Sequence, residues 1–395
     1  MGDGYRDALL DWLACAARGA GEPASVAARE AGDGLLERVA AAATAGHVLD
    51  FDDTYAPGLA HLSAATAPAA VVLGAELGAD VGAVLAAYAA GFEAMGALAR
   101  SCHPALYDGG WHPTAVCAPA GAAVAAARLL GLDADRTRTA VAIGLLRAGG
   151  LRAAFGSDAK ALQVGLAAAA GVQAARLAAA GARADADAIA AGPAGFAAAF
   201  AAGAVSLDDV LSARGAIDDN WIKAYPCCLQ THAAIDAALA AAAERPSPAR
   251  LGARLSVAVH PVSRRAAAFD AVSDGLEAKF SIPYLTAYAL LHGAPGVDAF
   301  AAVDAGAAAL AARIVVRTDA ALAPDEALLE IDGAVAAHVR APRGCPANRL
   351  SGGELRAKAR ALAGDALAGL LDDPRRPAAD LRAALSPRTS GAARA

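Results

Sequence analysis

The stretch Asn220-Trp221-Ile222-Lys223-Ala224-Tyr225-Pro226-Cys227-Cys228-Leu229-Gln230-Thr231-His232 lies where the character of the chain changes. It holds one of three Trp, two of six Cys and one of only four Lys. The alanine-rich run that follows directly, residues 233–243, predicts a helix. We therefore expect a chemically active segment docked on the start of a helix, near the boundary between two kinds of structure.

The residues before this stretch predict a bundle of helices. The spacing of large apolar residues predicts two helices within residues 1–48, and alanine-rich sequence predicts a helical pair over 66–99. Further helices are expected over 119–130, 134–149 and 161–180. Alanine side chains are small, so such helices can approach closely, which favours a tightly packed bundle over a sheet.

Strand patterns appear only after residue 250. Residues 254–260 and 313–318 alternate with the period of a strand. Two further strands, 327–331 and 335–340, are separated by Asp332-Gly333-Ala334 and predict a hairpin. A helix is expected between the first two strands, over 281–291.

The helical pattern returns over residues 354–371, which predicts a discontinuous organisation. We predict a mainly α fold in which residues 1–247 and 343–386 form one large all-helical domain from both chain ends. Residues 248–342 would form a smaller inserted α+β domain, placed as a lid. The tail, 387–395, is expected to be disordered.

Composition excludes several classes of function. The chain has 395 residues and a formal net charge of −6, which argues against nucleic acid or an anionic membrane as the main partner. Alanine supplies most of the 57% hydrophobic residues, and we find no transmembrane pattern and no signal peptide. Six Cys without a spacing framework indicate reduced thiols, so we expect a cytoplasmic protein.

Lysine usage is more informative. Of 34 Lys plus Arg, only four are Lys: Lys160, Lys223, Lys279 and Lys358. A remaining Lys can mark a position where the planar, always-charged guanidinium of Arg would not serve. The alternative is that these lysines are remnants of a genome that favours Arg.

Candidate catalytic groups stand at the ends of predicted elements. His61 follows the acidic turn 50–54, His112 precedes Pro113, Lys160 lies just inside a helix start and Lys223 precedes Tyr225-Pro226. A cation at a helix N-terminus is disfavoured, so Lys160 needs an anionic partner or a lowered pKa. Around one cleft, such groups would bind a small polycarboxylate and move a proton beside a carboxylate. Taken singly, each His could equally be a structural loop residue.

Other chemistries find no support in the sequence. No phosphate loop, Rossmann glycine pattern or Gly-x-Ser-x-Gly elbow is present. His103 and His112 share a loop without the spacing of a metal site, so we expect no metal and no cofactor. Cys227 and Cys228 are adjacent and are better explained as small packing residues than as nucleophiles.

Several stretches together resemble the MmgE/PrpD family, which includes 2-methylcitrate dehydratase, cis-aconitate decarboxylase and iminodisuccinate epimerase. The resemblance spans nearly the whole chain and consists of six stretches in order. They are His47-Val-Leu-Asp-Phe-Asp-Asp-Thr54, Gly110-Trp-His-Pro-Thr114, Gly156-Ser-Asp-Ala-Lys-Ala-Leu-Gln163, residues 223–236, Ala278-Lys-Phe-Ser-Ile-Pro-Tyr284 and Cys345-Pro-Ala-Asn-Arg-Leu-Ser351.

The resemblance implies a helical domain with an α+β lid, a homodimer, and catalysis without metal or organic cofactor. It places His112, Lys160 and Lys223 at what look like family active-site positions, and His61 in the same pocket. We expect Lys160 and Lys223 to bind carboxylate, His112 to lead as acid or base, and His61 to act as its counterpart. Further substrate-binding candidates are Asp50, Asp53, Thr54, Gln163, Cys228, Arg264 and Lys279.

The chain also departs from the family pattern. Leu62 stands where a Pro is usual after the His, Gln163 where a His is common, and Leu229-Gln230 where a basic residue or His is common. The region 259–265 lacks a Tyr that some relatives supply. We therefore expect a lyase, of dehydratase or decarboxylase type, whose small di- or tricarboxylate substrate differs from methylcitrate. The alternatives are an epimerase of a related amino or imino acid and a non-catalytic carboxylate-binding protein.

Overall fold

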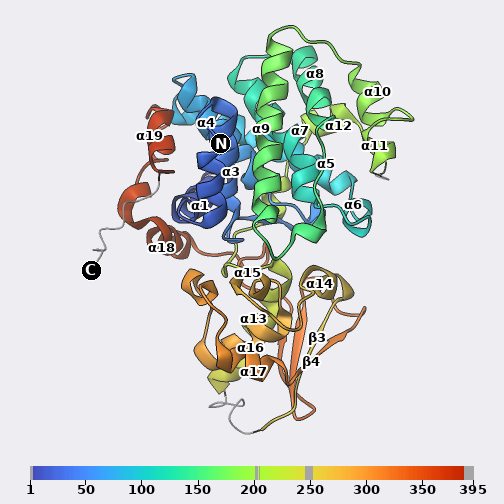
Figure 1. The fold of residues 1–395 in the computed structure, drawn as a ribbon, viewed down its shortest axis with the longest axis vertical. Coiled ribbons are helices and arrows are strands. Elements are labelled where there is room, and N and C mark those ends of the chain that lie inside the picture. Colours follow the sequence, from blue (N-terminus) through green and yellow to red (C-terminus); the bar gives the residue numbers. More distant parts are fainter. Residues whose placement is uncertain (1–2, 201–202, 204, 245–251, 387–395) are drawn as a thin grey trace.

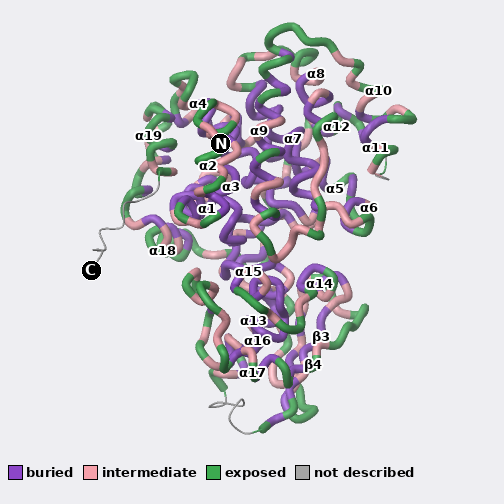
Figure 2. Tube along the Cα trace, viewed as in Figure 1, coloured by how far each residue is buried: buried purple, intermediate pink, exposed green. Residues whose placement is uncertain are grey.

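The computed structural model describes residues 3–200, 203, 205–244 and 252–386 (Figure 1), and these contain two large hydrophobic cores. The larger core is helical, and the smaller one lies around a four-stranded sheet. Buried residues run through the centre of the helical part and continue to the junction near α15 (Gly275–Ala278), as Figure 2 shows. The mainly α fold with a small α+β part is thus confirmed.

The helical part is built around long helices rich in Ala and Gly. Its N-terminal helices are α1 (Asp3–Gly19), α2 (Pro23–Glu30), α3 (Leu35–His47), α4 (Ser63–Glu76), α5 (Val81–Ser101), α6 (Ala105–Asp108), α7 (Pro113–Leu129), α8 (Ala134–Leu145), α9 (Ala159–Ala179), α10 (Ala186–Ala191), α11 (Phe196–Ala199) and α12 (Leu207–Ser212). α7 packs on α4, α5, α8 and α9 and is the central helix of this part. The approach is close enough that a Cβ on Gly171 of α9 would lie 2.5 Å from the Pro119 carbonyl oxygen of α7.

The C-terminal segment returns to the helical part. α18 (Gly352–Ala363) packs against α1, and α19 (Ala378–Ala383) packs against α4, on the side where the N-terminus lies (Figure 1). α18 begins with a capping box in which Ser351 and Glu354 exchange side-chain and backbone hydrogen bonds. Residues distant in sequence therefore share one helical core.

The smaller core surrounds the strands in the order β4-β3-β5-β6. β3 runs parallel to β4 and antiparallel to β5, which pairs antiparallel with β6. The elements of this part are α13 (His232–Glu244), β3 (Leu255–Val259), α14 (Pro261–Ala266), α15, α16 (Ile282–His292), α17 (Ala305–Ala311), β4 (Ile314–Thr318), β5 (Ala327–Ile331) and β6 (Ala334–Val339). Alternate residues of β3 and β5 are buried, as the period-two pattern predicts.

The predicted hairpin is confirmed by the turn between β5 and β6. Asp332 and Gly333 both have positive φ, at 53° and 82°, which suits a tight two-residue hairpin turn. The expectation of two helices before residue 48 is wrong, because the Gly-rich segment 31–34 separates α2 from α3.

The predicted boundary at residue 248 differs from the observed packing. α13 precedes that boundary but packs on α16, β5 and β6, within the smaller core. The change from one core to the other therefore falls before α13, in the stretch that carries Lys223. The tail from 387 lies outside the described residues.

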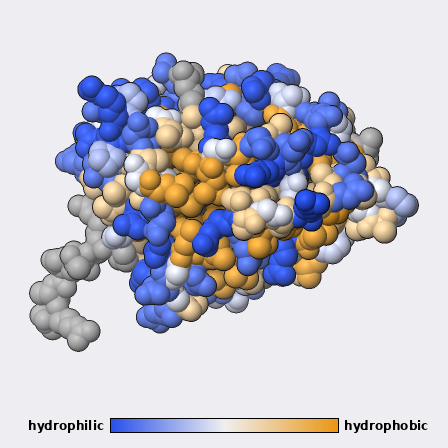
Figure 3. Space-filling model, turned by 90° about the horizontal axis from the view of Figure 1, so that it is seen from above, coloured by the Kyte–Doolittle hydropathy of each residue, from blue (hydrophilic) through white to orange (hydrophobic). Residues whose placement is uncertain are grey.

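Two core helices, α5 and α9, are long and apolar enough to cross a membrane by length and composition. Most of each apolar window is buried inside the protein, 67% for α5 and 56% for α9, so their composition is explained by close packing on α7. Hydrophobic side chains also form a band on the face seen from above (Figure 3). The exposed large apolar residues include Leu146, Leu166 and Leu177.

We predict that Gly171→Ala lowers the free energy of unfolding by about 1–3 kcal/mol, because the new methyl group meets backbone of α7. Helix propensity alone predicts the opposite sign. The matched control is Gly353→Ala in α18, where the nearest atom lies 3.9 Å away and the residue is exposed. The control should gain up to about 1 kcal/mol. Equal effects of both variants in chemical denaturation would contradict close packing of α7 and α9.

Candidate active site

The candidate site is organised around a buried loop, residues 48–54, between α3 and the short strand β1 (Thr54–Tyr55). β1 pairs with β2 (Asn220–Trp221), which brings the loop beside the segment that contains Lys223. Asp50 adopts a left-handed conformation with φ of 53°, a region that Asp tolerates better than most residues. The loop thereby turns the Asp50 side chain toward α9 and Lys223.

Asp50 forms a buried ion cluster with two lysines. Its Oδ1 accepts hydrogen bonds from Lys160 Nζ at 2.9 Å and from Lys223 Nζ at 2.8 Å. Burial alone would raise the pKa of Asp50, but the positive charges of Lys160 and Lys223 outweigh it and hold that pKa well below its usual value. Asp50 is the anionic partner that a lysine at the start of α9 requires.

Lys223 is fully coordinated within the protein. Besides Asp50 Oδ1, its ammonium donates to the carbonyl oxygens of Asp50 and Cys227, both at 3.0 Å. Burial disfavours the charge on Lys223, but the carboxylates of Asp50 and Asp52 outweigh burial and raise its pKa. All three N–H donors of a lysine are thus in use, so Lys223 holds the loop and Asp50 in place.

The other two lysines hold the backbone of the same loop. Lys279 donates to the carbonyl oxygens of Leu49 at 2.9 Å and Val48 at 3.3 Å, and burial lowers its pKa to about 8. Lys358 of α18 donates to the Phe51 carbonyl at 2.8 Å and pairs with Asp11 at 2.6 Å. Every lysine of the chain therefore contacts residues 48–51.

Asp52 joins two buried histidines. Its carboxylate lies 3.0 Å from His47 Nδ1 and 3.2 Å from His61 Nδ1. Burial lowers the pKa of His61 to about 3 and also lowers that of His47, although Asp52 acts in the opposite direction on both. The three side chains are close enough to hold a metal ion, but hydrogen bonds from two neutral rings to one carboxylate account for their positions.

His112 lies at the start of α7 and contacts Gln163 of α9. Gln163 Nε2 lies 2.7 Å from His112 Nδ1, and the backbone N–H of His112 donates to the Gly150 carbonyl. The pKa of His112 lies well below its usual value, first because of burial and then because of Lys160. A neutral imidazole is therefore the form present near neutral pH.

One cleft of about 50 Å³ is lined by Asp50, both His61 and His112, and two of the lysines, Lys160 and Lys223. Phe155 and Phe280 stack on each other in its wall, and the Lys160 ammonium lies over both rings. The Tyr107 hydroxyl is buried and has no hydrogen-bond partner among the described residues. The residues that line the cleft are Asp50, Thr54, Leu59, His61, Tyr107, His112, Phe155, Lys160, Lys223, Cys228, Leu229, Gln230, Ala266 and Phe280.

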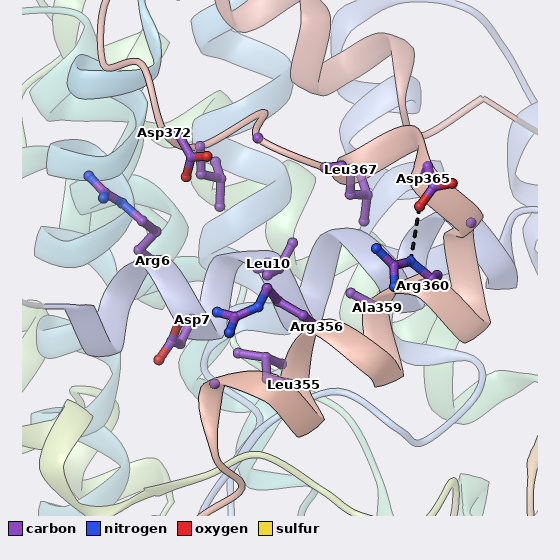
Figure 4. A pocket seen from close by; sticks show the side chains of 15 residues that line it. Arg6, Asp7, Leu10, Leu355, Arg356, Ala359, Arg360, Asp365, Leu367 and Asp372 are labelled. Atoms are coloured by element: carbon purple, nitrogen blue, oxygen red, sulfur yellow. Dashed lines mark hydrogen bonds and ion pairs between the residues drawn. The ribbon is translucent and has the colours of Figure 1, made fainter.

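A roomier cleft of about 230 Å³ lies between α1 and α18 but has a different character (Figure 4). Its lining contains both positive and negative side chains, including Arg6, Asp7 and Arg356. Arg360 forms an ion pair with Asp365 there. Unlike the cleft at Asp50, it brings together no histidine and no buried lysine. The chemistry is therefore better placed in the smaller cleft.

Comparison with known proteins agrees with this arrangement. A family model described as the MmgE/PrpD N-terminal domain matches residues 3–207, and one described as the MmgE/PrpD C-terminal domain matches residues 225–372. The chain belongs to the MmgE/PrpD family. The resemblance inferred from six short stretches is confirmed, and the break between the two family domains falls in the segment before α13.

Two relatives carry the name cis-aconitate decarboxylase. The protein from Homo sapiens is 32% identical over 200 residues, which is 49% of this chain and 41% of the relative. The protein from Mus musculus is 30% identical over 214 residues, 52% of this chain and 43% of the relative. The matches thus span less than half the length of either relative.

The structure brings most sequence-predicted site residues to the cleft, but not all of them. Asp50, Thr54, His61, His112, Lys160, Lys223 and Cys228 line it. Burial raises the thiol pKa of Cys228 to about 11 and that of Cys227 to about 12, which fits packing residues.

Four predicted substrate-binding residues do not line this cleft. Asp53 accepts hydrogen bonds from Ser63 and Asn220 at 2.7 Å, and burial raises its pKa to about 8. Arg264 pairs with Asp270 at the surface. Lys279 binds carbonyl oxygens of the loop, and Gln163 contacts His112. Both therefore support groups of the site without lining the cleft.

Sequence reasoning also missed residues that matter. Asp52 and His47 lie in the stretch 47–54 that resembles the family, yet their shared hydrogen bonds became visible only in three dimensions. Lys358 was identifiable only as one of the rare lysines. Tyr107 lies in the single-turn helix α6 and Phe155 in a turn, and in segments this short the spacing of residues does not indicate which way a side chain points.

We predict that Asp50→Asn lowers the free energy of unfolding by about 3–5 kcal/mol, because it leaves two buried ammonium groups without their carboxylate. The control is Asp298→Asn, since Asp298 is 97% exposed and pairs with Arg18 at 3.4 Å. That change should cost less than about 1 kcal/mol in the same denaturation experiment. An Asp50→Asn protein as stable as the control would show that the cluster does not hold the loop.

Proposed function

We propose that this protein is a metal-independent lyase that acts on a small di- or tricarboxylate by proton transfer at a carbon next to a carboxylate. The observation that carries the proposal is the convergence of His61, His112 and Lys160 in one cleft beside Asp50. These groups come from three separate segments of the chain, and a packing role for each alone would not require them to share a cleft.

The cleft offers donors for an anionic substrate. Lys160 makes one hydrogen bond, to Asp50, among the described residues, which leaves N–H donors for a substrate carboxylate. Tyr107, whose hydroxyl has no partner among the described residues, also lines this cleft. Lys223 is saturated and supports Asp50 instead of meeting the substrate. The aromatic walls lower the local dielectric, which strengthens these contacts.

Both lyase reactions need a proton-transfer group and a hydrogen-bond donor. In a dehydration, a base removes the proton next to a carboxylate, the electron pair forms the double bond, and the hydroxyl leaves with a proton as water. In a decarboxylation, the C–C bond breaks, CO₂ leaves, and the remaining electron pair is stabilised and then protonated. In either case, negative charge develops on the substrate and is stabilised by donors such as Lys160 and His112.

The names of the two relatives make cis-aconitate the first compound to test. A panel of acids should be tested as well, because less than half of each relative is matched and because Gln163 departs from the family pattern. The expected homodimer, the cytoplasmic location and the absence of a metal or cofactor remain predictions.

We predict that the purified protein converts at least one acid of a C4–C7 di- and tricarboxylate panel, followed by ¹³C NMR with and without EDTA. His112→Ala should lower kcat/KM by about 10²–10³-fold, because a hydrogen-bond donor to the developing negative charge is lost. His292→Ala is the matched control, since His292, the last residue of α16, is exposed and pairs with Asp304.

Four outcomes would count against the proposal. Full turnover by a folded His112→Ala protein would remove His112 from the site. Loss of activity with EDTA would overturn the metal-independent mechanism. Binding of the acids without any conversion would favour the non-catalytic alternative, and interconversion of stereoisomers without elimination would favour the epimerase.

A further inference from the structure

The two cleft histidines have ring nitrogens with opposite kinds of partner. His61 Nδ1 faces a carboxylate, Asp52, whereas His112 Nδ1 faces the amide nitrogen of Gln163. A carboxylate can only accept a hydrogen bond, and an amide nitrogen can only donate one. The partner of each Nδ1 therefore decides which nitrogen of a neutral ring carries the hydrogen.

For His61, the hydrogen must lie on Nδ1. Asp52 is ionised, because its pKa lies well below the usual value: burial would raise it, but His47 and His61 outweigh burial. Its Oδ2 lies 3.2 Å from His61 Nδ1, while Thr54 Oγ1 is farther, at 3.4 Å. A neutral His61 with hydrogen on Nδ1 has a bare Nε2, which lies 3.7 Å from Asp50 Oδ1 and is free to accept a proton.

Beside His112, two backbone groups of Leu151 fix the orientation of Gln163, because a backbone N–H can only donate a hydrogen bond and a carbonyl can only accept one. The Leu151 N–H donates to Gln163 Oε1 at 2.9 Å, and the Leu151 carbonyl accepts from Gln163 Nε2 at 3.2 Å. The side-chain amide cannot be reversed without breaking both bonds. Gln163 Nε2 must then donate to His112 Nδ1 at 2.7 Å, which places the ring hydrogen on Nε2.

We propose that His61 Nε2 is the atom that takes up and returns the substrate proton, whereas His112 is a fixed Nε2–H donor to a substrate oxygen. Asp52 and Gln163 are positioning residues that set these two tautomers. The inference deepens the proposed function and rests on it for the identity of the substrate. It revises the sequence-based expectation that His112 leads as acid or base.

Neutral His112 suits the stabilisation of negative charge on oxygen. A neutral imidazole donates a hydrogen bond without giving up a proton, so it can face a developing enolate or carboxylate oxygen throughout the reaction. Lys160, His47, His61 and Asp50 also face this ring. Gln163 has no titratable group, so the charge of this hydrogen-bond donor to His112 Nδ1 does not change with pH.

The test is the ¹⁵N NMR spectrum of the full-length protein labelled in histidine, recorded without substrate near neutral pH. Signals of the two residues are assigned from their loss in His61→Gln and His112→Gln. We expect hydrogen on Nδ1 of His61 and on Nε2 of His112. The opposite pattern, the same tautomer in both rings, or a doubly protonated ring would overturn the proposal.

A second measurement tests the role of Gln163. Gln163→Glu replaces the donor beside His112 with an acceptor, so His112 should acquire a hydrogen on Nδ1. The control is Gln173→Glu, which makes the same change on an exposed position of α9 and should leave the His112 signals in place. A bare His112 Nδ1 in Gln163→Glu would show that Gln163 does not set the tautomer.

These spectra are independent of turnover. If no acid of the panel is converted, the tautomers can still agree with the proposal, so failure of the lyase assignment and failure of the tautomer assignment are distinguishable. If Gln163→Glu does not fold, the spectrum of the wild-type protein decides.

Discussion

The contact of two buried ammonium groups with one oxygen of Asp50 is the constraint on which the site depends. Lys160 belongs to α9, Lys223 to the segment between the two cores, and Asp50 to the loop after α3. Lys279 from the smaller part and Lys358 from the C-terminal α18 bind the backbone of the same loop. The loop is therefore assembled only when both cores and both chain ends have come together, which ties the chemistry to completion of the fold.

The rarity of lysine acquires a physical explanation from this arrangement. Lys223 donates to three oxygens around a single point, and Lys358 likewise reaches Asp11, Phe51 and the Lys223 carbonyl. An ammonium with three rotatable donors fits such a cage, whereas the planar fork of Arg does not. All other Lys or Arg positions of the chain hold Arg, and the four lysines all contact one loop. Lys223, Lys279 and Lys358 hold the loop, whereas Lys160 lines the cleft and makes one hydrogen bond among the described residues, which leaves donors for substrate.

Much of the fold followed from the sequence, because periodicity reports which face of an element is buried. The strands and the hairpin at Asp332-Gly333 were predictable in this way, and so were the long alanine-rich helices. The position of α13 was not, since an apolar helix pattern does not say which core it joins. In the site, helix ends and rare residue types identified His112, Lys160 and Lys223. The directions of Asp50, Asp52 and Asp53 depend on the positive φ of Asp50 and could not be read from spacing. For the same reason Asp53 turned out to contact Ser63 and Asn220 instead of the cleft.

Proton transfer at a carbon next to a carboxylate is the step that defines the proposed function of the cleft at Asp50. Its most direct test is incorporation of deuterium in deuterated water, followed by ¹H NMR, because a reversible proton removal labels the starting acid and a decarboxylation labels the product. We expect deuterium beside a carboxylate in at least one acid or its product with the wild-type protein, and its loss in His61→Gln, which removes the proposed proton acceptor. Absence of deuterium from every acid and every product with folded wild-type protein, or undiminished incorporation by folded His61→Gln, would contradict proton transfer in this cleft.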